Sequence, residues 1–317
     1  MKAIVYRRYG PPEVLALEEI ERPTLRDGEV LIKVEAASVN PADWHFMRGA
    51  PYLVRMIAGL RKPKNPRLGI DVAGRVEAVG RSATQFKAGD EVFGTCRGAF
   101  AEYACARESA LAIKPANVTF EQAAATPLAA YTALQALRKG RIQSGQSVVI
   151  NGASGGVGTF AVQIAKSFGA EVTGVCSTRN VEMVRSIGAD HVVDYTRDDF
   201  TSSDQRYDLM LDCTGSHPLS AYRRILNPKA ICVLVGGKDD HFIGPMASAL
   251  LSGFTKQKFK PFLAKANQAD LITIRDLMAS GKVTPVIDRR YALSETAEAV
   301  RYLEAGHARG KVIIAVG

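Results

Sequence analysis

The stretch from residue 145 to 166, GQSVVINGASGGVGTFAVQIAK, constrains the fold of this chain more than any other. A β-branched run at 148–150 ends in the pair Asn151-Gly152, and an apolar helical pattern begins at Val157. Strand, glycine-rich turn and helix in this order build a dinucleotide site, because the free N–H groups and positive dipole end of the helix face the pyrophosphate. The stretch therefore predicts nucleotide binding.

Three glycines of this turn have separate expected roles. Gly155 permits a tight backbone path, Gly156 lets the main chain approach the phosphates, and Gly158 lets the helix pack closely on the strand. A glycine turn with only a structural role is the alternative. The strand and helix signals on both sides favour the nucleotide site.

The distribution of β and helical signals predicts two regions in a chain of 317 residues. Short strand patterns with turn signals fill the first 118 or so residues, and 43–47 is the one short helical candidate among them. Beyond Pro115, strand and helix patterns alternate with short turns as far as residue 235. That alternation predicts an α/β fold with a doubly wound parallel sheet covered by helices, the Rossmann arrangement.

Charge and cysteine usage narrow the class of protein. The net charge is +9, and the densest basic stretch, residues 61–67, has no aromatic interleaving, so a nucleic-acid partner is not expected. An anionic cofactor or substrate, or a merely solvated loop, explains the charge instead. The five cysteines are widely spread without a C-x-x-C pair, which predicts reduced thiols and argues against a structural zinc lobe.

Hydropathy predicts a cytoplasmic protein without a membrane partner. The chain opens on a strand-like segment, MKAIVYRR, with no leader pattern. No apolar run reaches the roughly 18 residues that a membrane span requires.

The end of the second nucleotide-domain strand predicts the cofactor. NAD sites carry Asp or Glu there to hold the ribose 2′-hydroxyl, whereas this strand, 171–176, ends in Cys176. Ser177, Thr178 and Arg179 follow at once and offer two hydroxyls and a guanidinium to a 2′-phosphate. The pattern predicts NADPH. The alternative is that Ser177 caps the next helix and Arg179 is solvated, and both roles can coexist.

Several segments resemble the zinc-independent quinone oxidoreductase branch of the medium-chain dehydrogenase/reductase superfamily, over essentially the whole chain. The markers are ASVNPADW at 37–44, GIDVAGRV at 69–76, GDEVFG at 89–94, TPLAAYTA at 126–133, the glycine-rich stretch at 145–166 and GHARGK at 306–311. They are specific for family and fold and poorly specific for substrate.

The resemblance implies a GroES-like substrate domain at 1–118, completed by 266–317, and a Rossmann domain at 119–265. The cofactor is then expected in the cleft between them, at the carboxyl ends of the strands. The resemblance also implies a homodimer formed by edge pairing of a late strand, for which residues 259–264 are the candidate.

Cofactor contacts are carried over from the family position by position. They are Asn40, Thr126, Ser154, Gly155, Gly156, Val157, Ser177, Arg179, Tyr195, Cys213, Val235, Phe262, Ala264, His307, Ala308 and Arg309. Tyr195 is expected along the adenosine end, although a core tyrosine is nearly as good an interpretation. Among these positions Asn40 is also a catalytic candidate.

The resemblance further implies that a catalytic zinc is absent. Zinc dehydrogenases of the superfamily place a cysteine where Asn40 stands and a histidine-glutamate pair where Ile70-Asp71 stands. A catalytic zinc needs about three protein ligands, and Asn40 and Ile70 cannot supply theirs. The expected chemistry is therefore hydride transfer to an already activated acceptor, a quinone or an α,β-unsaturated carbonyl compound.

The proton donor and the acceptor stay open. Tyr52 is the candidate donor, with packing at the pocket mouth as its alternative, and solvent can also supply the proton. Asp43 is expected to order the turn after Asn40. An enoyl-thioester reductase acting on acyl-CoA, with the 61–67 segment meeting phosphates, is the second enzyme hypothesis. A nucleotide-binding protein of this fold with little turnover is the third.

Overall fold

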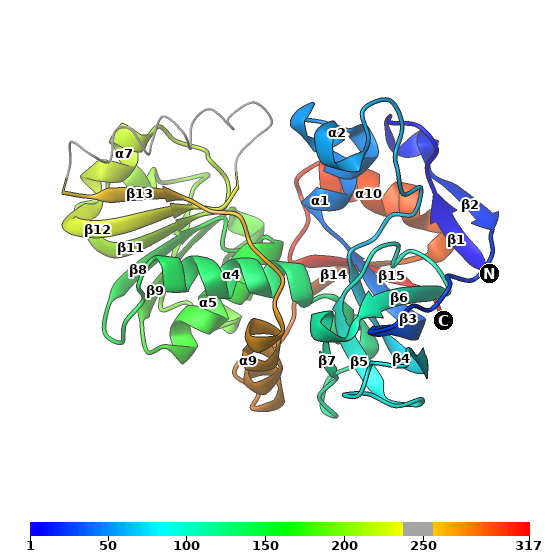
Figure 1. Cartoon of the computed structure of the whole chain (residues 1–317). Helices are drawn as coiled ribbons and strands as arrows, with labels where there is room; N and C mark the ends of the chain where they lie inside the picture. Colours follow the sequence, from blue (N-terminus) through cyan, green and yellow to red (C-terminus); the bar gives the residue numbers. More distant parts are fainter. Residues whose placement is uncertain (237–255) are drawn as a thin grey trace. The chain divides into compact units, whose positions relative to one another are not determined.

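The computed structural model describes residues 1–236 and 256–317, which form two compact units (Figure 1). The first comprises Met1–Ala129, Ala266–Gly281 and Pro285–Gly317, and the second comprises Ala130–Lys265 and Lys282–Thr284. Among the described residues, no helix is long and apolar enough to cross a membrane.

A six-stranded parallel sheet is the centre of the second unit, and its order is β10-β9-β8-β11-β12-β13. Because the order runs outward in both directions from β8, the sheet is doubly wound, as the sequence predicts. The strands are β8 (Ser147–Asn151), β9 (Glu171–Cys176), β10 (His191–Asp194), β11 (Tyr207–Asp212), β12 (Leu226–Leu234) and β13 (Lys258–Pro261).

Helices cover this sheet because their apolar stripes pack on its β-branched faces. In α5 every residue from Gly158 to Ala165 is buried, and the core of this unit includes Val149, Met210 and Tyr222. The helices are α4 (Pro127–Lys139), α5 (Gly156–Ser167), α6 (Val181–Ser186) and α7 (Leu219–Arg224), with short 3-10 turns η3 (Thr178–Asn180) and η4 (Phe200–Ser202).

A seven-stranded, mainly antiparallel sheet dominates the first unit, in the order β14-β15-β3-β4-β5-β7 with β6 paired to β3. Strands β1 and β2 form a separate hairpin. This β-rich unit matches the predicted GroES-like architecture. The strands are β1 (Lys2–Val5), β2 (Ala16–Glu19), β3 (Glu29–Val39), β4 (Asp71–Val79), β5 (Glu91–Thr95), β6 (Tyr103–Arg107), β7 (Leu111–Ile113), β14 (Ile287–Ala292) and β15 (Lys311–Ala315).

Helices of the first unit pack around this sheet. Residues 119–129 cluster with this unit, because α3 packs on β3 and β4. The helices are α1 (Pro41–Arg48), α2 (Leu53–Ala58), α3 (Phe120–Ala124), α9 (Gln268–Ala279) and α10 (Thr296–Glu304), with 3-10 turns η1 (Pro12–Val14), η2 (Glu108–Ala110) and η6 (Leu293–Glu295).

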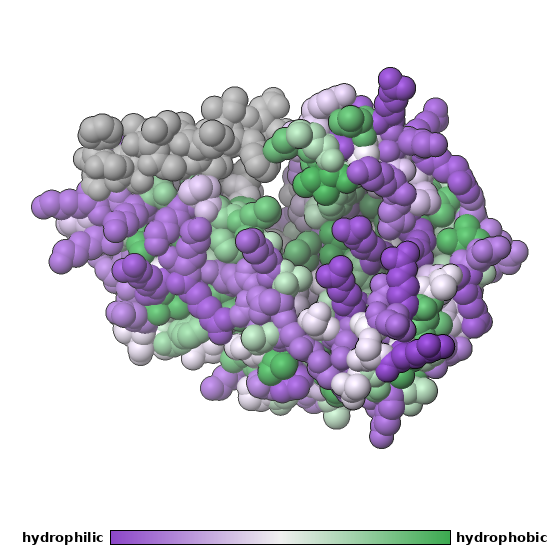
Figure 2. Space-filling view, viewed as in Figure 1, coloured by the Kyte–Doolittle hydropathy of each residue, from purple (hydrophilic) through white to green (hydrophobic). Residues whose placement is uncertain are grey.

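Helix α2 has no counterpart among the elements expected from sequence. It buries none of its residues, and apolar side chains gather on the surface where it lies (Figure 2). Tyr52, Leu53, Met56, Ile57 and Leu60 are all exposed.

Candidate nucleotide site and a buried polar cluster

The glycine turn lies between β8 and α5, as the sequence predicts. The N–H groups of Gly152 and Ala153 both donate to the carbonyl of Val175 on β9, which holds the turn against the neighbouring strand. A Cβ on Gly158 would lie 2.1 Å from the Gly152 carbonyl oxygen, so only glycine permits this approach of helix to strand. The first N–H groups of α5 have no intrahelical acceptors, which suits them to phosphate.

Predicted cofactor contacts of the second unit follow the carboxyl ends of its parallel strands. Because the strands are parallel, the segments after all six emerge at one edge of the sheet. Backbone hydrogen bonds tie successive segments together there: Tyr195 N–H donates to Cys176 O, Cys213 N–H to Asn151 O, and Phe262 N–H to Leu234 O. The edge carries Ser154, Gly155, Gly156, Val157, Ser177, Arg179, Tyr195, Cys213, Val235, Phe262 and Ala264.

Asn151 and Asp212 connect the ends of the two central strands. They are register partners on β8 and β11, and Asn151 Nδ2 donates to Asp212 Oδ1 over 2.9 Å. Tyr222 donates its hydroxyl to Asp212 Oδ2 over 3.1 Å. This buried network makes the strand ends that carry the turn rigid.

Asn180 is a residue of this edge that the sequence interpretation missed. Its side chain is buried, and Nδ2 donates to the hydroxyl oxygens of both Ser154 and Ser177. The only sequence signal was a polar residue three positions after Ser177. Nothing along the chain links it to Ser154, which lies 26 residues earlier.

Thr178 has a different environment from the one its position suggests. Its hydroxyl donates to Asp194 Oδ2 over 2.5 Å, so it is turned toward β10 and not offered to a phosphate. Asp194 is the register partner of Cys176, and therefore a carboxylate does stand one strand away from the expected phosphate position. Hydrogen bonds from Thr178 and Thr196 and the charge of Arg197 lower the pKa of Asp194.

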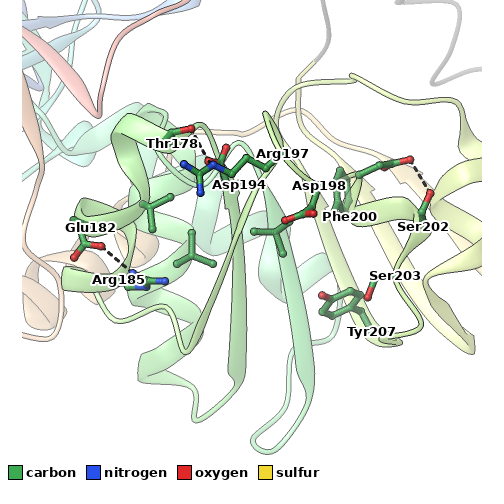
Figure 3. Close-up of a pocket in the computed structure, with 14 residues that line it drawn as sticks. Thr178, Glu182, Arg185, Asp194, Arg197, Asp198, Phe200, Ser202, Ser203 and Tyr207 are labelled. Carbon is green, nitrogen blue, oxygen red and sulfur yellow. Dashed lines mark hydrogen bonds and ion pairs between the residues drawn. The ribbon is translucent and has the colours of Figure 1, made fainter.

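A surface groove of about 810 Å³ lies beside the edge strand β10, between α6 and η4 (Figure 3). Its charged side chains pair with neighbours: Arg185 with Glu182 over 2.8 Å, and Arg197 with Asp194 over 3.6 Å. Of the side chains that the sequence offered to the cofactor, Thr178 alone is among the residues lining the groove, and its hydroxyl donates to Asp194. The carboxyl edge of the sheet is therefore the better candidate site.

The first unit contains a buried polar cluster where three strands meet. Val312 pairs with Val39 and Ser38 pairs with Asp71, so Lys311, Asn40 and Asp71 lie side by side at the ends of β15, β3 and β4. Lys311 Nζ donates to Asn40 Oδ1 and lies 3.6 Å from Asp71 Oδ2. Asn40 Nδ2 donates to Asp71 Oδ2 over 2.9 Å and to Ser38 O over 3.3 Å.

Asp71 also connects this cluster to the start of α4. Its Oδ1 accepts the backbone N–H of Leu128 over 3.0 Å, and its Oδ2 accepts the Ser38 hydroxyl over 3.0 Å. A carboxylate on a free N–H of the first helical turn favours the helix, because that end of the dipole is positive. Burial raises the pKa of Asp71, and the nearby Lys311 ammonium opposes that effect.

Asp43 orders the turn after Asn40, as its position suggested. Its Oδ2 accepts the backbone N–H of Asn40 over 2.8 Å, while its buried Oδ1 has no partner within the described residues. Burial and, to a smaller extent, the neighbouring Asp71 charge raise the pKa of Asp43 to about 7, against the hydrogen bond from the Asn40 backbone. Burial lowers the pKa of Lys311, against the attraction of Asp71 and Asp43.

The remaining candidates of the first unit are spread over several elements. Thr126 is fully buried and donates its hydroxyl to Gln122 O over 2.8 Å, while Tyr52 precedes α2 and is 67% exposed. The other three residues, His307, Ala308 and Arg309, form the segment before β15, where Arg309 N–H donates to Asp288 Oδ2.

The polar cluster does not fit a metal cation. Two of its residues, Asn40 and Asp71, stand where the resemblance implies zinc ligands in zinc dehydrogenases, but the Lys311 ammonium binds Asn40 and faces Asp71. A second cation beside this ammonium would be repelled. Within residues 1–236 and 256–317, no group of three or more His, Cys, Asp or Glu side chains is placed to hold a metal.

Family models match both parts of the chain. Residues 26–116 match the alcohol dehydrogenase GroES-like domain, and residues 187–314 match a family described as zinc-binding dehydrogenase.

Individual relatives match nearly the whole of this chain. The NADPH-dependent alkenal/one oxidoreductase of Arabidopsis thaliana chloroplasts is 36% identical, over 99% of this chain and 79% of the relative. The chloroplast envelope quinone oxidoreductase homolog of the same plant is 34% identical, over 99% of this chain and 98% of the relative. A solved quinone oxidoreductase from Coxiella burnetii superposes with a TM-score of 0.90 at 30% identity, covering 100% of this chain and 99% of that one.

These likenesses define the class of protein. The chain belongs to the medium-chain dehydrogenase/reductase superfamily, in its quinone oxidoreductase branch. The resemblance on the sequence motifs is confirmed.

Proposed function

We propose that this protein is an NADPH-dependent reductase of quinones or α,β-unsaturated carbonyl compounds. The observation that carries the proposal is the glycine turn at the carboxyl edge of a doubly wound sheet, with Ser177 and Arg179 directly after β9. The name of the Arabidopsis alkenal/one oxidoreductase, which specifies NADPH, supports the cofactor and the acceptor class.

The residues present fit this cofactor. The Gly158 contact brings the helix start close to the strand, so the N–H groups of Gly156 and Val157 would hold the pyrophosphate. Ser177 and Arg179 would hold the 2′-phosphate. Bound NADPH would supply a hydride for the electrophilic carbon of the acceptor.

Asn40 has a positioning role in this proposal. An amide has two N–H donors, and those of Asn40 go to Asp71 and to the Ser38 carbonyl. Asn40 therefore holds its loop in place and does not offer a donor to the reacting oxygen. Tyr52, with its exposed side chain, is the candidate for returning a proton to the reduced acceptor.

The exposed apolar surface of α2 favours the proposal that the acceptor is apolar. Leu53, Met56, Ile57 and Leu60 are each more than half exposed, and exposed apolar patches mark binding surfaces. The exposed basic residues Arg61 and Lys62 follow directly. This neighbourhood keeps an acyl-CoA substrate, whose phosphates would meet the basic residues, as the second candidate.

Steady-state oxidation of NADPH with a quinone, a free enone and crotonyl-CoA tests the acceptor. We expect the quinone or the enone to be the best substrate. A crotonyl-CoA preference would favour the enoyl-thioester reductase, and tight NADPH binding without turnover on any acceptor would favour the binding protein. Comparing KM for NADPH and NADH tests the cofactor preference. An equal or lower KM for NADH would overturn the proposed use of NADPH.

Tyr52→Phe tests the proton donor. We expect kcat to fall about 100-fold with KM little changed, because a positioned general acid contributes roughly 10²–10⁴-fold. An unchanged kcat would assign the proton to solvent. Tyr103→Phe is the matched control, because it removes a tyrosine hydroxyl on β6 that accepts from Arg22 and lies outside the predicted site.

We further propose that 1–118 with 266–317 form the substrate domain and that 119–265 form the nucleotide domain, of which residues 119–129 pack with the first unit. We also propose that the protein is cytoplasmic. The proposed homodimer would pair through β13, because β13 lies at the end of the sheet order, next to β12. A Pro substitution at Phe259 removes a backbone donor from that strand and should give a monomer by light scattering if the edges pair.

A further inference from the structure

Asn180 joins two segments that the proposed function assigns to the cofactor. It is 4% exposed, and its Nδ2 donates to Ser154 Oγ over 3.0 Å and to Ser177 Oγ over 3.2 Å. Its backbone N–H donates to the carbonyl of Ser177 over 2.9 Å. Asn180 therefore links the glycine turn after β8 to the segment after β9.

The two hydrogen bonds decide how the serine hydroxyls are oriented. The amide has two hydrogens, and one goes to each serine oxygen. Each serine oxygen then accepts from Asn180, and its own hydrogen points elsewhere. Within the described parts of the chain, neither hydroxyl donates to another protein group. The result is a pair of O–H donors set by one buried amide.

The other end of the Asn180 amide has no structural use. Oδ1 is buried and lacks a hydrogen-bond partner among the described residues. A buried acceptor without a partner costs stability, so a side chain retained only for stability would not leave one. This favours a role for Asn180 in function.

We propose that Asn180 is a specificity-determining positioning residue, which directs the Ser154 and Ser177 hydroxyls toward the ribose 2′-phosphate and so favours NADPH over NADH. The inference rests on the proposed function. A phosphate is an acceptor-only group with about two negative charges, so it benefits most from two donors set in advance. The 2′-hydroxyl of NADH carries no charge and benefits less.

The proposed pair of hydroxyl donors is Ser154 with Ser177, and Thr178 is not one of them. Thr178 follows Ser177 directly but donates to Asp194, so its hydroxyl is already used. Asn180, by contrast, engages Ser154 and Ser177 as acceptors and leaves their hydrogens available.

Calorimetric titration with NADPH and NADH tests the proposal. Asn180→Ala should weaken NADPH binding about tenfold, as expected when charge-assisted hydrogen bonds lose their alignment, with NADH affinity nearly unchanged. Asn180→Asp should weaken NADPH binding further, because its carboxylate would accept both serine hydrogens and repel the phosphate. Asn227→Ala is the control, because it also removes an amide, one that donates to Asp208, and it should keep the wild-type preference for NADPH.

A mutant cycle separates positioning from a merely structural role. In a Ser154→Ala, Ser177→Ala background, Asn180→Ala should leave the ratio of NADPH to NADH affinity unchanged, because no hydroxyl remains to direct. The inference would be overturned if Asn180→Ala in the wild type weakened NADPH and NADH binding equally. It would also be overturned if Asn180→Ala lowered the affinity ratio as much in the double serine variant as in the wild type. A wild-type protein that binds NADH as well as NADPH would instead overturn the proposed function. Circular dichroism of each variant identifies misfolding.

Discussion

The Lys311 ammonium donates a hydrogen bond to the amide oxygen of Asn40 inside the first unit, where the two residues are 3% and 2% exposed. Asp71 Oδ2 lies 3.6 Å from the ammonium and accepts a hydrogen bond from Asn40 Nδ2 over 2.9 Å. One cation thus balances a fully buried carboxylate and determines the orientation of the neighbouring amide.

Replacing Lys311 by Met should destabilise the fold. It leaves Asp71 buried without its cation, and removing one partner of a buried pair costs about 3–5 kcal/mol. Urea unfolding followed by circular dichroism measures the loss. Lys87→Met, at an exposed lysine, should change the midpoint little. A Lys311→Met midpoint equal to that of the control would contradict the assigned role.

Stability should depend on pH through Asp43. Burial raises its pKa in the folded protein from 3.8 to about 7, so the folded state keeps a proton that the unfolded chain releases. The resulting stabilisation is complete below pH 4 and is lost as the pH rises through 7, on the order of 4 kcal/mol in total.

Asp43→Asn isolates this effect because its side chain stays neutral. Relative to the wild type, the variant should gain free energy of unfolding as the pH rises from 4 to 8. Urea unfolding at several pH values measures this difference. Asp198→Asn, at an exposed position, should follow the wild-type curve. Parallel curves for Asp43→Asn and the wild type would rule out a raised pKa.

Gly158→Ala should disturb the glycine turn. The added Cβ would lie 2.1 Å from the Gly152 carbonyl oxygen, and such overpacking costs about 1–3 kcal/mol. At Gly155 the nearest atom to an added Cβ is the same oxygen at 3.4 Å, so Gly155→Ala should fold normally. Thermal unfolding compares the two, and equal melting temperatures would contradict the expected clash.

Arg179→Ala should raise KM for NADPH about tenfold and leave KM for NADH nearly unchanged, because a guanidinium–phosphate bond is charge-assisted. Added salt should narrow the difference between the wild type and the variant. Arg185→Ala is the control, since that side chain pairs with Glu182. A similar increase for both cofactors would show that Arg179 does not contact the 2′-phosphate.

Local patterns predicted most of the elements. The β-branched run before Asn151 and the helical pattern after Val157 became β8 and α5, and the alternation beyond Pro115 became the parallel sheet. These signals are short-range, because side-chain periodicity and glycine turns act within a few residues. Helix α2 was missed although Leu53, Met56 and Ile57 stand at helical spacing, because a segment of six residues is too short for periodicity to separate a helix from a strand.

By itself, the sequence determined the doubly wound fold, the family and the place of the nucleotide turn. Tertiary structure alone decided which polar side chains meet. Asn40 and Lys311 are 271 residues apart, and strand register brings them together; Asn180 reaches Ser154 only because β8 and β9 are neighbours. The hydroxyl of Thr178 likewise turned to Asp194 across two parallel strands. Hydrogen bonds depend on positions within a few tenths of an ångström, which periodicity along a chain does not encode.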